Sequence, residues 1–328
     1  MLVGGEGTRL RPLTFTTPKQ LLPIAGRPMI ERVVAHLARH GIDAAVLSMG
    51  YQPDAFLAAY PDGCCAGVKL TYATEPEPLD TGGGIAFAAR HAGIDETFLA
   101  VNGDVLTELD ITALLAFHRE RGGAATIALT PVEDPSRFGV VVTDERGRVL
   151  AFIEKPPRAE APTNLINAGT YVVEPTVLDR IPPGRRVSVE RETFPSLVSD
   201  AALYAVASDA AWVDAGTPIT YLDANLQAAR RDPRGRRGAG TSVSPQATVT
   251  GSVLGAGVVI EAGAKVEAAV LMDEVRVEAD AVVCRSILGR RVVVGRGARV
   301  DDLTVLGDGV HVPPGSELHG TNQPAGTR

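Results

Sequence analysis

A repeat of about 17 residues near the C-terminus constrains the fold of this chain more than any other feature. Aliphatic residues recur at steps of 17 or 18 in three interleaved series. Small or polar residues separate them, as in GAGVVI and GRGARV, which is the hexapeptide pattern of a parallel β-helix. The series are Val249, Val266, Val283 and Val300; Val243, Ile260, Val277, Val294 and Val312; and Leu254, Leu271, Leu288 and Leu306. We therefore predict a left-handed parallel β-helix of about four to five coils over residues 241–320, followed by a tail at 321–328.

Residues 1–226 follow a different rhythm, in which short β-rich runs alternate with helical stretches. The runs are AAVLSM, VKLTYA, TFLAV and ATIALT; one helix is expected between Pro28 and Gly41, and another after an N-cap at Asp110. This alternation predicts an α/β domain with a mostly parallel sheet, which binds ligands beyond the C-terminal ends of its strands. The segment FGVVVTDERGRVLAFIEKP predicts a β-hairpin that turns at Gly147 and is inserted over the site.

Residues 227–240, with the sequence QAARRDPRGRRGAG, separate these two parts. They are basic, rich in Gly, Arg and Pro, and show no apolar periodicity. A nucleic-acid-binding tail is one interpretation of the arginines, but the overall charge favours a solvated linker. The predicted organisation is a domain at 1–226, a linker at 227–240 and the β-helix.

Composition narrows the class of protein. A chain of 328 residues with 45% hydrophobic residues is long enough for two domains. Its net charge of −7 argues against nucleic acid or an anionic membrane as the main partner. Cys64, Cys65 and Cys284 have no metal-binding spacing, and two of them are adjacent, which fits a reducing cytosol. With no signal peptide and no apolar run near 18 residues, a soluble cytoplasmic protein is expected.

The chain starts with a glycine-rich stretch, MLVGGEGTRLRPL. Glycines allow close backbone approach to an anion, and basic side chains supply compensating charge, so the stretch predicts a polyphosphate site. Its spacing matches neither the P-loop nor the dinucleotide fingerprint. Because only three residues precede the turn, either the first strand is very short or the start lies downstream of the true one. The residues concerned are Gly4, Gly5 and Gly7, then Arg9, Arg11 and Lys19.

Carboxylates follow β-rich runs at two places, Asp104 in NGD and Asp214 in WVDAGT. Two such carboxylates, with phosphate oxygens and waters, would complete an octahedral Mg²⁺ site. A turn-forming role is the alternative for either aspartate, and the accompanying phosphate loop favours the metal. In EKP, Glu154 can accept sugar hydroxyls while Lys155 meets a phosphate, although a surface charge pair would have the same sequence.

These motifs resemble the sugar-1-phosphate nucleotidyltransferases over essentially the whole chain, and among them the GDP-mannose pyrophosphorylases (mannose-1-phosphate guanylyltransferases). The resemblance rests on GGEGTRLRPLT with Pro18 and Lys19, PLDTGGGIAFA, NGD, FGVVV, FIEKP, INAGTYV, SVERETFPSL and WVDAGTP. It implies a Rossmann-like nucleotidyltransferase domain followed by the hexapeptide β-helix. The implied substrates are an NTP and a sugar 1-phosphate, with Mg²⁺ as cofactor.

The resemblance also implies a role for each matching residue. The reaction would be in-line attack of a sugar-phosphate oxygen on the α-phosphorus of the NTP. Because this nucleophile is already an anion, catalysis needs positioning and charge neutralisation rather than a general base. Arg9, Lys19 and Lys155 are the implied catalytic residues. The implied nucleotide-binding residues are Gly4, Gly5, Gly7, Thr8, Arg9, Lys19, Glu75, Gly82, Gly83, Asn102 and Asp104; the sugar-phosphate-binding residues are Gly139, Glu154, Lys155 and Asn167; and the metal ligands are Asp104 and Asp214.

The identity of the base can be argued from hydrogen bonding. Guanine offers two adjacent donors on its Watson–Crick edge, which one carboxylate can accept together, whereas uracil and thymine offer a single donor. Glu75 stands where many thymidylyl or uridylyl relatives carry an amide. We predict that Glu75 selects guanine, with Glu77 as the alternative and a solvated loop charge as the competing interpretation.

Three other functions remain open at this point. A glucose-1-phosphate thymidylyl- or uridylyltransferase would share nearly every site residue, and a regulatory homologue would bind a nucleotide sugar without catalysis. A hexapeptide acyltransferase would use a histidine and a loop extruded from a coil, but the coils run without a long insertion, and His311 and His319 lie in the terminal coils. The β-helix is better suited to symmetric assembly, so a homo-oligomer is expected.

Overall fold

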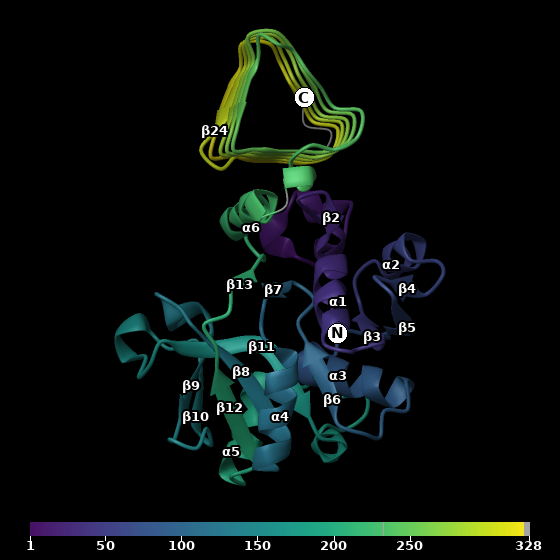
Figure 1. The fold of residues 1–328 in the computed structure, drawn as a ribbon, viewed down its shortest axis with the longest axis vertical. Coiled ribbons are helices and arrows are strands. Elements are labelled where there is room, and N and C mark those ends of the chain that lie inside the picture. Colours follow the sequence, from purple (N-terminus) through teal and green to yellow (C-terminus); the bar gives the residue numbers. More distant parts are fainter. Residues whose placement is uncertain (232, 325–328) are drawn as a thin grey trace. The chain divides into compact units, whose positions relative to one another are not determined.

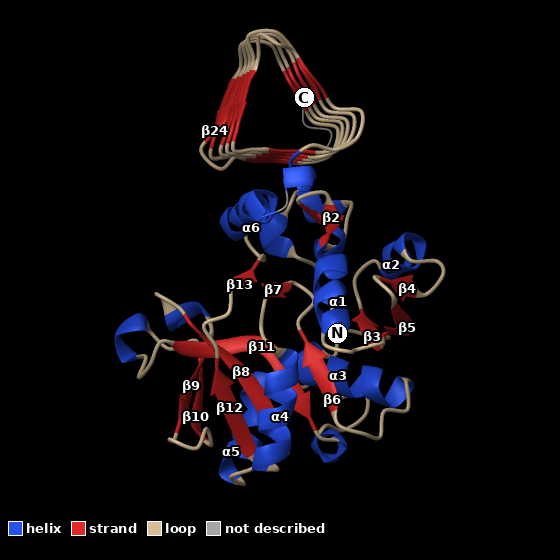
Figure 2. Ribbon diagram, viewed as in Figure 1, coloured by secondary structure: helices blue, strands red, loops and turns tan. Residues whose placement is uncertain are grey.

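The computed structural model describes residues 1–231 and 233–324, which form two compact units. The first unit comprises Met1–Gly5 and Glu31–Trp212, and the second comprises Glu6–Ile30 and the chain from Val213 onward. Packing joins the early segment Glu6–Ile30 to the C-terminal part, which the sequence did not indicate. The expected domain boundaries themselves stay a prediction. Helices and strands are distinguished in Figure 2.

A mixed β-sheet forms the core of the first unit. Strand β11 (Leu165–Val173) is antiparallel to β6 (Phe98–Val101), β8 (Ala125–Pro131) and β9 (Gly139–Thr143), whereas β12 (Leu203–Ala207) is parallel to β8. Since β6 and β8 both oppose β11, they run in the same direction. The predicted parallel order therefore holds for these two strands and also for β9 and β12, whereas β11 runs in the opposite direction, as does the strand after β9.

The first residues of the chain continue the parallel order toward β3 (Ala44–Met49) and β5 (Val68–Thr74), which are parallel to each other. Leu2 makes parallel bridges to Ser48 at the end of β3 and to Asn102 just after β6. Short as it is, this N-terminal stretch occupies the place of a strand between β3 and β6.

The predicted hairpin is confirmed. Strands β9 and β10 (Val149–Glu154) are antiparallel, and the turn between them closes through a hydrogen bond from the Gly147 N–H to the Asp144 carbonyl oxygen, 3.0 Å. The remaining short strands outside the β-helix are β1 (Pro23–Ile24), β2 (Arg27–Pro28), β4 (Cys64–Cys65), β7 (Val105–Thr107) and β13 (Trp212–Asp214).

Six α-helices accompany the strands in the described residues. The predicted N-cap is confirmed, because Asp110 Oδ1 accepts from the Ala113 N–H at 2.9 Å. The helix expected between Pro28 and Gly41 is also present, with Pro28 in β2 immediately before it. The helices are α1 (Met29–Arg39), α2 (Pro53–Ala59), α3 (Asp80–His91), α4 (Ile111–Arg121), α5 (Phe194–Ser199) and α6 (Pro218–Arg231).

The predicted linker contains regular structure where it is described. Helix α6 continues to Arg231, with Ala229 buried, and Pro233–Arg236 form a 3₁₀ turn. Helix α6 therefore extends past residue 227, where the linker was expected to begin, because burial of one helix face overrides local composition. Residue 232 and residues 325–328 of the expected tail lie outside the described residues.

The second unit contains the β-helix that the repeat predicts. Three parallel five-stranded sheets form its faces, which gives five coils and matches the left-handed hexapeptide class. Figure 1 shows the coils end-on as a triangle. The sheets are β14 (Ser242–Val243), β17 (Val259–Ile260), β20 (Arg276–Val277), β23 (Val293–Val294) and β26 (His311–Val312); β15 (Thr248–Thr250), β18 (Lys265–Glu267), β21 (Val282–Cys284), β24 (Arg299–Asp301) and β27 (Glu317–His319); and β16 (Val253–Leu254), β19 (Val270–Leu271), β22 (Ile287–Leu288), β25 (Val305–Leu306) and β28 (Asn322–Gln323).

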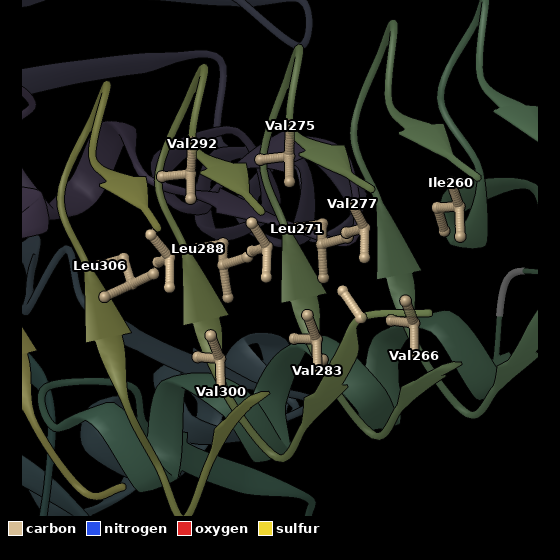
Figure 3. Close-up of a cluster of buried hydrophobic side chains, with 14 of the residues drawn as sticks. Ile260, Val266, Leu271, Val275, Val277, Val283, Leu288, Val292, Val300 and Leu306 are labelled. Carbon is tan, nitrogen blue, oxygen red and sulfur yellow. The ribbon is translucent and has the colours of Figure 1, made fainter. Parts of the chain in front are cut away.

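The three aliphatic series fill the interior of the coils. Val266, Val283 and Val300 are neighbours in register, as are Leu271, Leu288 and Leu306, and all of them are buried (Figure 3). The step of 18 arises at Asp302–Leu303, where two consecutive residues adopt positive φ and absorb one extra residue in a turn. Among the described residues, no helix has both the length and the apolar character needed to cross a membrane.

Adjacent valines of β23 provide a test of this packing. Val294 is 0% exposed inside the coil, whereas Val293 is half-buried on the other face. We expect Val294→Ala to lower the free energy of unfolding by about 2–3 kcal/mol, because it removes buried methyl groups and leaves a cavity. Val293→Ala should cost less than about 1 kcal/mol. Chemical denaturation measures the free energy of unfolding of both variants. Equal losses would contradict the assignment of Val294 to the interior of the coil and Val293 to its outer face.

Candidate active site

The glycine signature forms a tight turn in the second unit. Gly7 has φ of 62° and precedes a 3₁₀ turn at Thr8–Leu10. Its carbonyl oxygen accepts from Thr14 Oγ1 at 2.9 Å, and a Cβ at Gly7 would lie 3.1 Å from Lys19 Cβ. A larger residue would therefore push against Lys19. Arg9 is exposed, whereas Lys19 is only 9% exposed.

The other glycines of the signature are assigned to the first unit, and Arg11 makes a local ion pair. Gly4 and Gly5 belong to the first unit, where the Gly4 carbonyl oxygen accepts from the Tyr51 N–H at 3.2 Å. Arg11 Nη2 donates to Glu6 Oε2 at 2.7 Å, so this arginine is part of a local ion pair.

Arg9 and Asp214 come together at Gly216, although more than 200 residues separate them in the sequence. The Gly216 N–H donates to Asp214 Oδ1 at 2.9 Å. A Cβ at Gly216 would lie 2.7 Å from Asp214 Oδ1 and 2.8 Å from Arg9 Nη2. Only glycine leaves both polar groups where they are, which gives the WVDAGT motif a steric reason for its glycine.

In the first unit, the NGD motif, at the end of β6, meets the INAGTY motif in the middle of β11. The Asn102 N–H donates to the Gly169 carbonyl oxygen at 2.9 Å. Asn167 Oδ1 accepts from the Gly169 N–H, and its Nδ2 donates to the Tyr171 hydroxyl, both at 2.9 Å. Asn102 and Asn167, two of the predicted site residues, thus both bond to Gly169, where the register of β11 shifts.

The Tyr171 hydroxyl lies among carboxylates. Burial raises the pKa of Tyr171, and the negative charges of Glu190, Glu154 and Asp104 raise it further, against the opposing effect of the Asn167 hydrogen bond. Three acidic side chains from separate motifs therefore act on one buried hydroxyl. Two of them, Asp104 and Glu154, were predicted from the sequence.

Glu154 and Lys155 form the charge pair that EKP allows, and the backbone at Lys155 is unusual. Lys155 Nζ lies 3.0 Å from Glu154 Oε1, with side chains 56% and 21% exposed. Lys155 has φ of 50°, a region that side chains other than glycine rarely adopt, and such residues concentrate at functional sites. Gly139 pairs with Glu154 across the hairpin, and a Cβ there would lie 3.1 Å from Glu154 Oε2.

Glu75, Gly82 and Gly83 all take part in holding the first turn of α3. The N–H groups of Gly82 and Gly83 donate to the Val187 carbonyl oxygen at 2.8 and 3.1 Å. Glu75 Oε1 accepts from Ser48 Oγ at 2.8 Å, and Oε2 accepts from the Leu79 N–H at 3.0 Å. These bonds fix the orientation of the Glu75 carboxylate. The nucleotide-binding roles of the three residues stay a prediction.

Sequence reasoning missed Glu190. It lies in a π-helical turn, Val189–Thr193, a rare element that often occurs at functional sites. Its Oε2 accepts from Thr81 Oγ1 at 2.6 Å and from Ser188 Oγ at 2.9 Å. The signal was available, because SVERETFP was recognised as a family motif, but nothing in the sequence showed that its first glutamate approaches Tyr171.

The two predicted metal ligands are chemically suited to Mg²⁺. Asp104 and Asp214 are both half-buried carboxylates, and Mg²⁺ prefers oxygen ligands, keeping several waters and adding substrate phosphates. Asp104 belongs to the first unit and Asp214 to the second. Within residues 1–231 and 233–324, no three His, Cys, Asp or Glu side chains are grouped closely enough to hold a metal ion by themselves.

Comparison with known proteins gives a consistent result. A family model described as Nucleotidyl transferase matches residues 1–231, and one described as GMPPB C-terminal domain matches residues 238–321. Mannose-1-phosphate guanylyltransferase of Mycobacterium tuberculosis is 44% identical over 296 residues, covering 86% of this chain and 82% of that protein. Mannose-1-phosphate guanylyltransferase 1 of Arabidopsis thaliana is 38% identical over 332 residues, covering 95% and 91%.

A solved structure supports the fold of the N-terminal part. HddC from Yersinia pseudotuberculosis aligns with a TM-score of 0.60 and 27% sequence identity, covering 69% of this chain and 96% of that one. A second structure of HddC, complexed with GMP-PN, aligns with a TM-score of 0.59. Together with the β-helix, these matches confirm the fold class that the sequence predicts.

Gly216→Ala tests whether the Arg9 and Asp214 side chains must keep their places. The added methyl would displace the ends of two side chains rather than backbone, so we expect the transferase activity to fall by about 100-fold with little change in stability. Gly93→Ala is the control, because Gly93 has φ of 65° and no neighbouring atom within 4 Å of a Cβ. It should cost stability but not specific activity. Steady-state rates and thermal unfolding of both variants are measured. Full activity of Gly216→Ala would show that activity does not depend on the positions of Arg9 and Asp214.

Proposed function

Because the chain belongs to the mannose-1-phosphate guanylyltransferase family of nucleotidyltransferases, we propose that it transfers GMP from GTP to mannose 1-phosphate. The products are GDP-mannose and pyrophosphate. In this reaction a phosphate oxygen of the sugar attacks the α-phosphorus in line and pyrophosphate leaves.

The observation that carries the sugar side of this proposal is the pair at the end of β10. Glu154 supplies a carboxylate that accepts hydrogen bonds from sugar hydroxyls, and Lys155 supplies an ammonium group for the phosphate. Asn167 and Gly139 complete the proposed sugar-phosphate site. The Glu154 carboxylate and the Lys155 ammonium group lie side by side. A substrate that carries hydroxyls beside a phosphate can use both groups, whereas a simple anion can use only Lys155.

On the nucleotide side, Arg9 and Lys19 neutralise the phosphates, while the turn of Gly4, Gly5, Gly7 and Thr8 approaches them through its backbone. Asn102, Gly82 and Gly83 complete the proposed nucleotide site. Asp104 and Asp214 would hold Mg²⁺, which supplies charge neutralisation at the triphosphate when bound. Positive charge from Arg9 and Lys19 stabilises the transition state and the leaving pyrophosphate. No general base is required, because the attacking phosphate oxygen is already an anion.

The choice of base rests with Glu75. Its two carboxylate oxygens each accept one bond from the protein and retain further lone pairs, and they are held in a fixed orientation by Ser48 and Leu79. A fixed carboxylate can accept both N1–H and the N2 amine of guanine. The protein is proposed to act in the cytosol as a homo-oligomer, with neither nucleic acid nor membrane as a partner.

The reaction is tested by measuring pyrophosphate release with GTP, UTP, dTTP and ATP, each combined with mannose and glucose 1-phosphate. We expect the highest kcat/KM for GTP with mannose 1-phosphate and loss of turnover when EDTA removes divalent ions. A preference for UTP or dTTP with glucose 1-phosphate would support the alternative transferase. No turnover with any pair would support the regulatory homologue.

Glu75→Gln tests the origin of base selectivity. The amide presents a donor where guanine needs an acceptor, so we expect the GTP-to-UTP ratio of kcat/KM to fall by about tenfold or more. Glu77→Gln is the matched control, because Glu77 is exposed two residues away. A selective effect of Glu77→Gln would transfer the role to that residue. An unchanged ratio in both variants would reject base recognition by either carboxylate.

A further inference from the structure

The segment that carries the glycine signature is packed with the β-helix. Glu6–Ile30 belongs to the same compact unit as the chain from Val213 onward. The sequence suggests only an assembly role for the β-helix, because hexapeptide coils contain no motif of the transfer reaction. The contacts inside this unit indicate a second role.

Two side-chain hydrogen bonds connect the β-helix to the signature segment. Thr16 Oγ1 donates to Asp308 Oδ2 at 2.9 Å, and Arg290 Nη1 donates to Thr17 Oγ1 at 3.1 Å. The two β-helix residues are also fixed to each other, because Asp308 Oδ1 accepts from the Arg290 N–H at 2.8 Å. Hydrogen bonds that involve a charged partner are stronger than neutral ones, and Thr17 is buried.

Helix α6 holds the other end of the same segment. Its buried Asn225 accepts from the Ala25 N–H through Oδ1 at 2.8 Å, and the hydroxyl of buried Tyr221 donates to the Pro23 carbonyl oxygen. Helix α6 also packs against β16 and β19 of the β-helix. The segment is therefore attached at two places, at Thr16–Thr17 and at Pro23–Ala25.

The attachment at Thr16–Thr17 lies next to the proposed nucleotide-binding residues. Lys19 follows Thr17 after one buried proline, and its Cβ lies against Gly7. Thr14, two residues before Thr16, bonds to the Gly7 carbonyl oxygen. A shift of Thr16 and Thr17 would therefore be transmitted in both directions, to Lys19 and to the Gly7 turn.

We propose that Arg290 and Asp308 are positioning residues for the nucleotide site, and that the β-helix holds the glycine signature in its binding conformation. This inference rests on the proposed function, since it concerns how Arg9 and Lys19 are placed for an NTP. The two residues touch no substrate in this proposal. They act through Thr16 and Thr17.

Another pair of coils provides an internal comparison. Asp273 Oδ1 accepts from the Ala256 N–H at 2.8 Å, the same contact between coils that Asp308 makes to Arg290. Asp308 differs in making a second bond, through Oδ2, to the signature segment. In each aspartate, one carboxylate oxygen accepts a backbone bond from the preceding coil. Only in Asp308 does the other oxygen bond to Thr16.

This comparison gives a matched pair of variants, Asp308→Asn and Asp273→Asn, made in the full-length chain. Each keeps one oxygen for the backbone bond and replaces the other with an amide nitrogen. In Asp308→Asn this removes the charge-assisted bond from Thr16 and leaves only a weaker neutral contact, in which the amide would donate to the hydroxyl. We expect Asp308→Asn to raise the KM for GTP about tenfold, with the KM for mannose 1-phosphate changed less than about twofold. Asp273→Asn should resemble the parent protein in both constants.

Thr16→Val removes the hydroxyl from the other side of the bond and should raise the KM for GTP by a similar factor. The double variant should lose little more than either single one, since both remove the same interaction. Thr16→Ser, which keeps a hydroxyl, should restore the parent value. A loss that came only from damaged structure would lower the active fraction, and therefore kcat, without this selective effect on GTP.

Amide hydrogen exchange provides a readout that does not depend on activity. Residues 8–21 should exchange faster in Asp308→Asn than in Asp273→Asn, because one of their attachments is lost. If the parent protein turns over no NTP, the proposed function fails, and the exchange comparison still tests the attachment. Equal exchange in both variants, or equal KM values for GTP in an active enzyme, would overturn the positioning role.

Discussion

The stacking of β-helix coils is the constraint on which the second unit depends. A single coil of about 17 residues cannot bury its aliphatic side chains, and each coil becomes stable only against the coil before and after it. Register between coils is therefore strict, and even the one extra residue at Asp302–Leu303 is confined to a turn. This regularity fixes the side chains on the turns as well, so Arg290 and Asp308 present polar groups at defined positions to the segment they contact.

The repeat, the alternating strands and helices, the hairpin and the Asp110 cap could all be predicted from local sequence, because each depends on periodicity or on a short-range hydrogen bond. The antiparallel direction of β11 could not, since its strand pattern is the same in either direction. The helical start of the expected linker was also missed, because tertiary burial of Ala229 decides it. The attachment of Glu6–Ile30 to the C-terminal part depends on contacts between residues almost 300 positions apart, which no local pattern encodes.

For the site residues too, the sequence predicted some features and the tertiary structure was needed for others. Motifs identified which residues to examine, and the structure adds why some of them are constrained: Gly216 accommodates both Arg9 and Asp214, and Lys155 adopts a backbone conformation that is costly for its residue type. Glu190 was overlooked because its importance comes from the effect of its charge on Tyr171, which lies in another element, strand β11. Glu154 and Lys155 form the ion pair that both interpretations of EKP require, so their role in binding stays a prediction.

The order of the chain through the two units has a consequence for biosynthesis. The chain leaves the first unit after Gly5, contributes Glu6–Ile30 to the second, and returns to the second only at Val213. The glycine signature leaves the ribosome before most of the first unit, yet the residues that hold it are made after that unit. The second unit therefore cannot be completed during synthesis of the first, and the signature reaches its final packing only after the β-helix residues that hold it have been made.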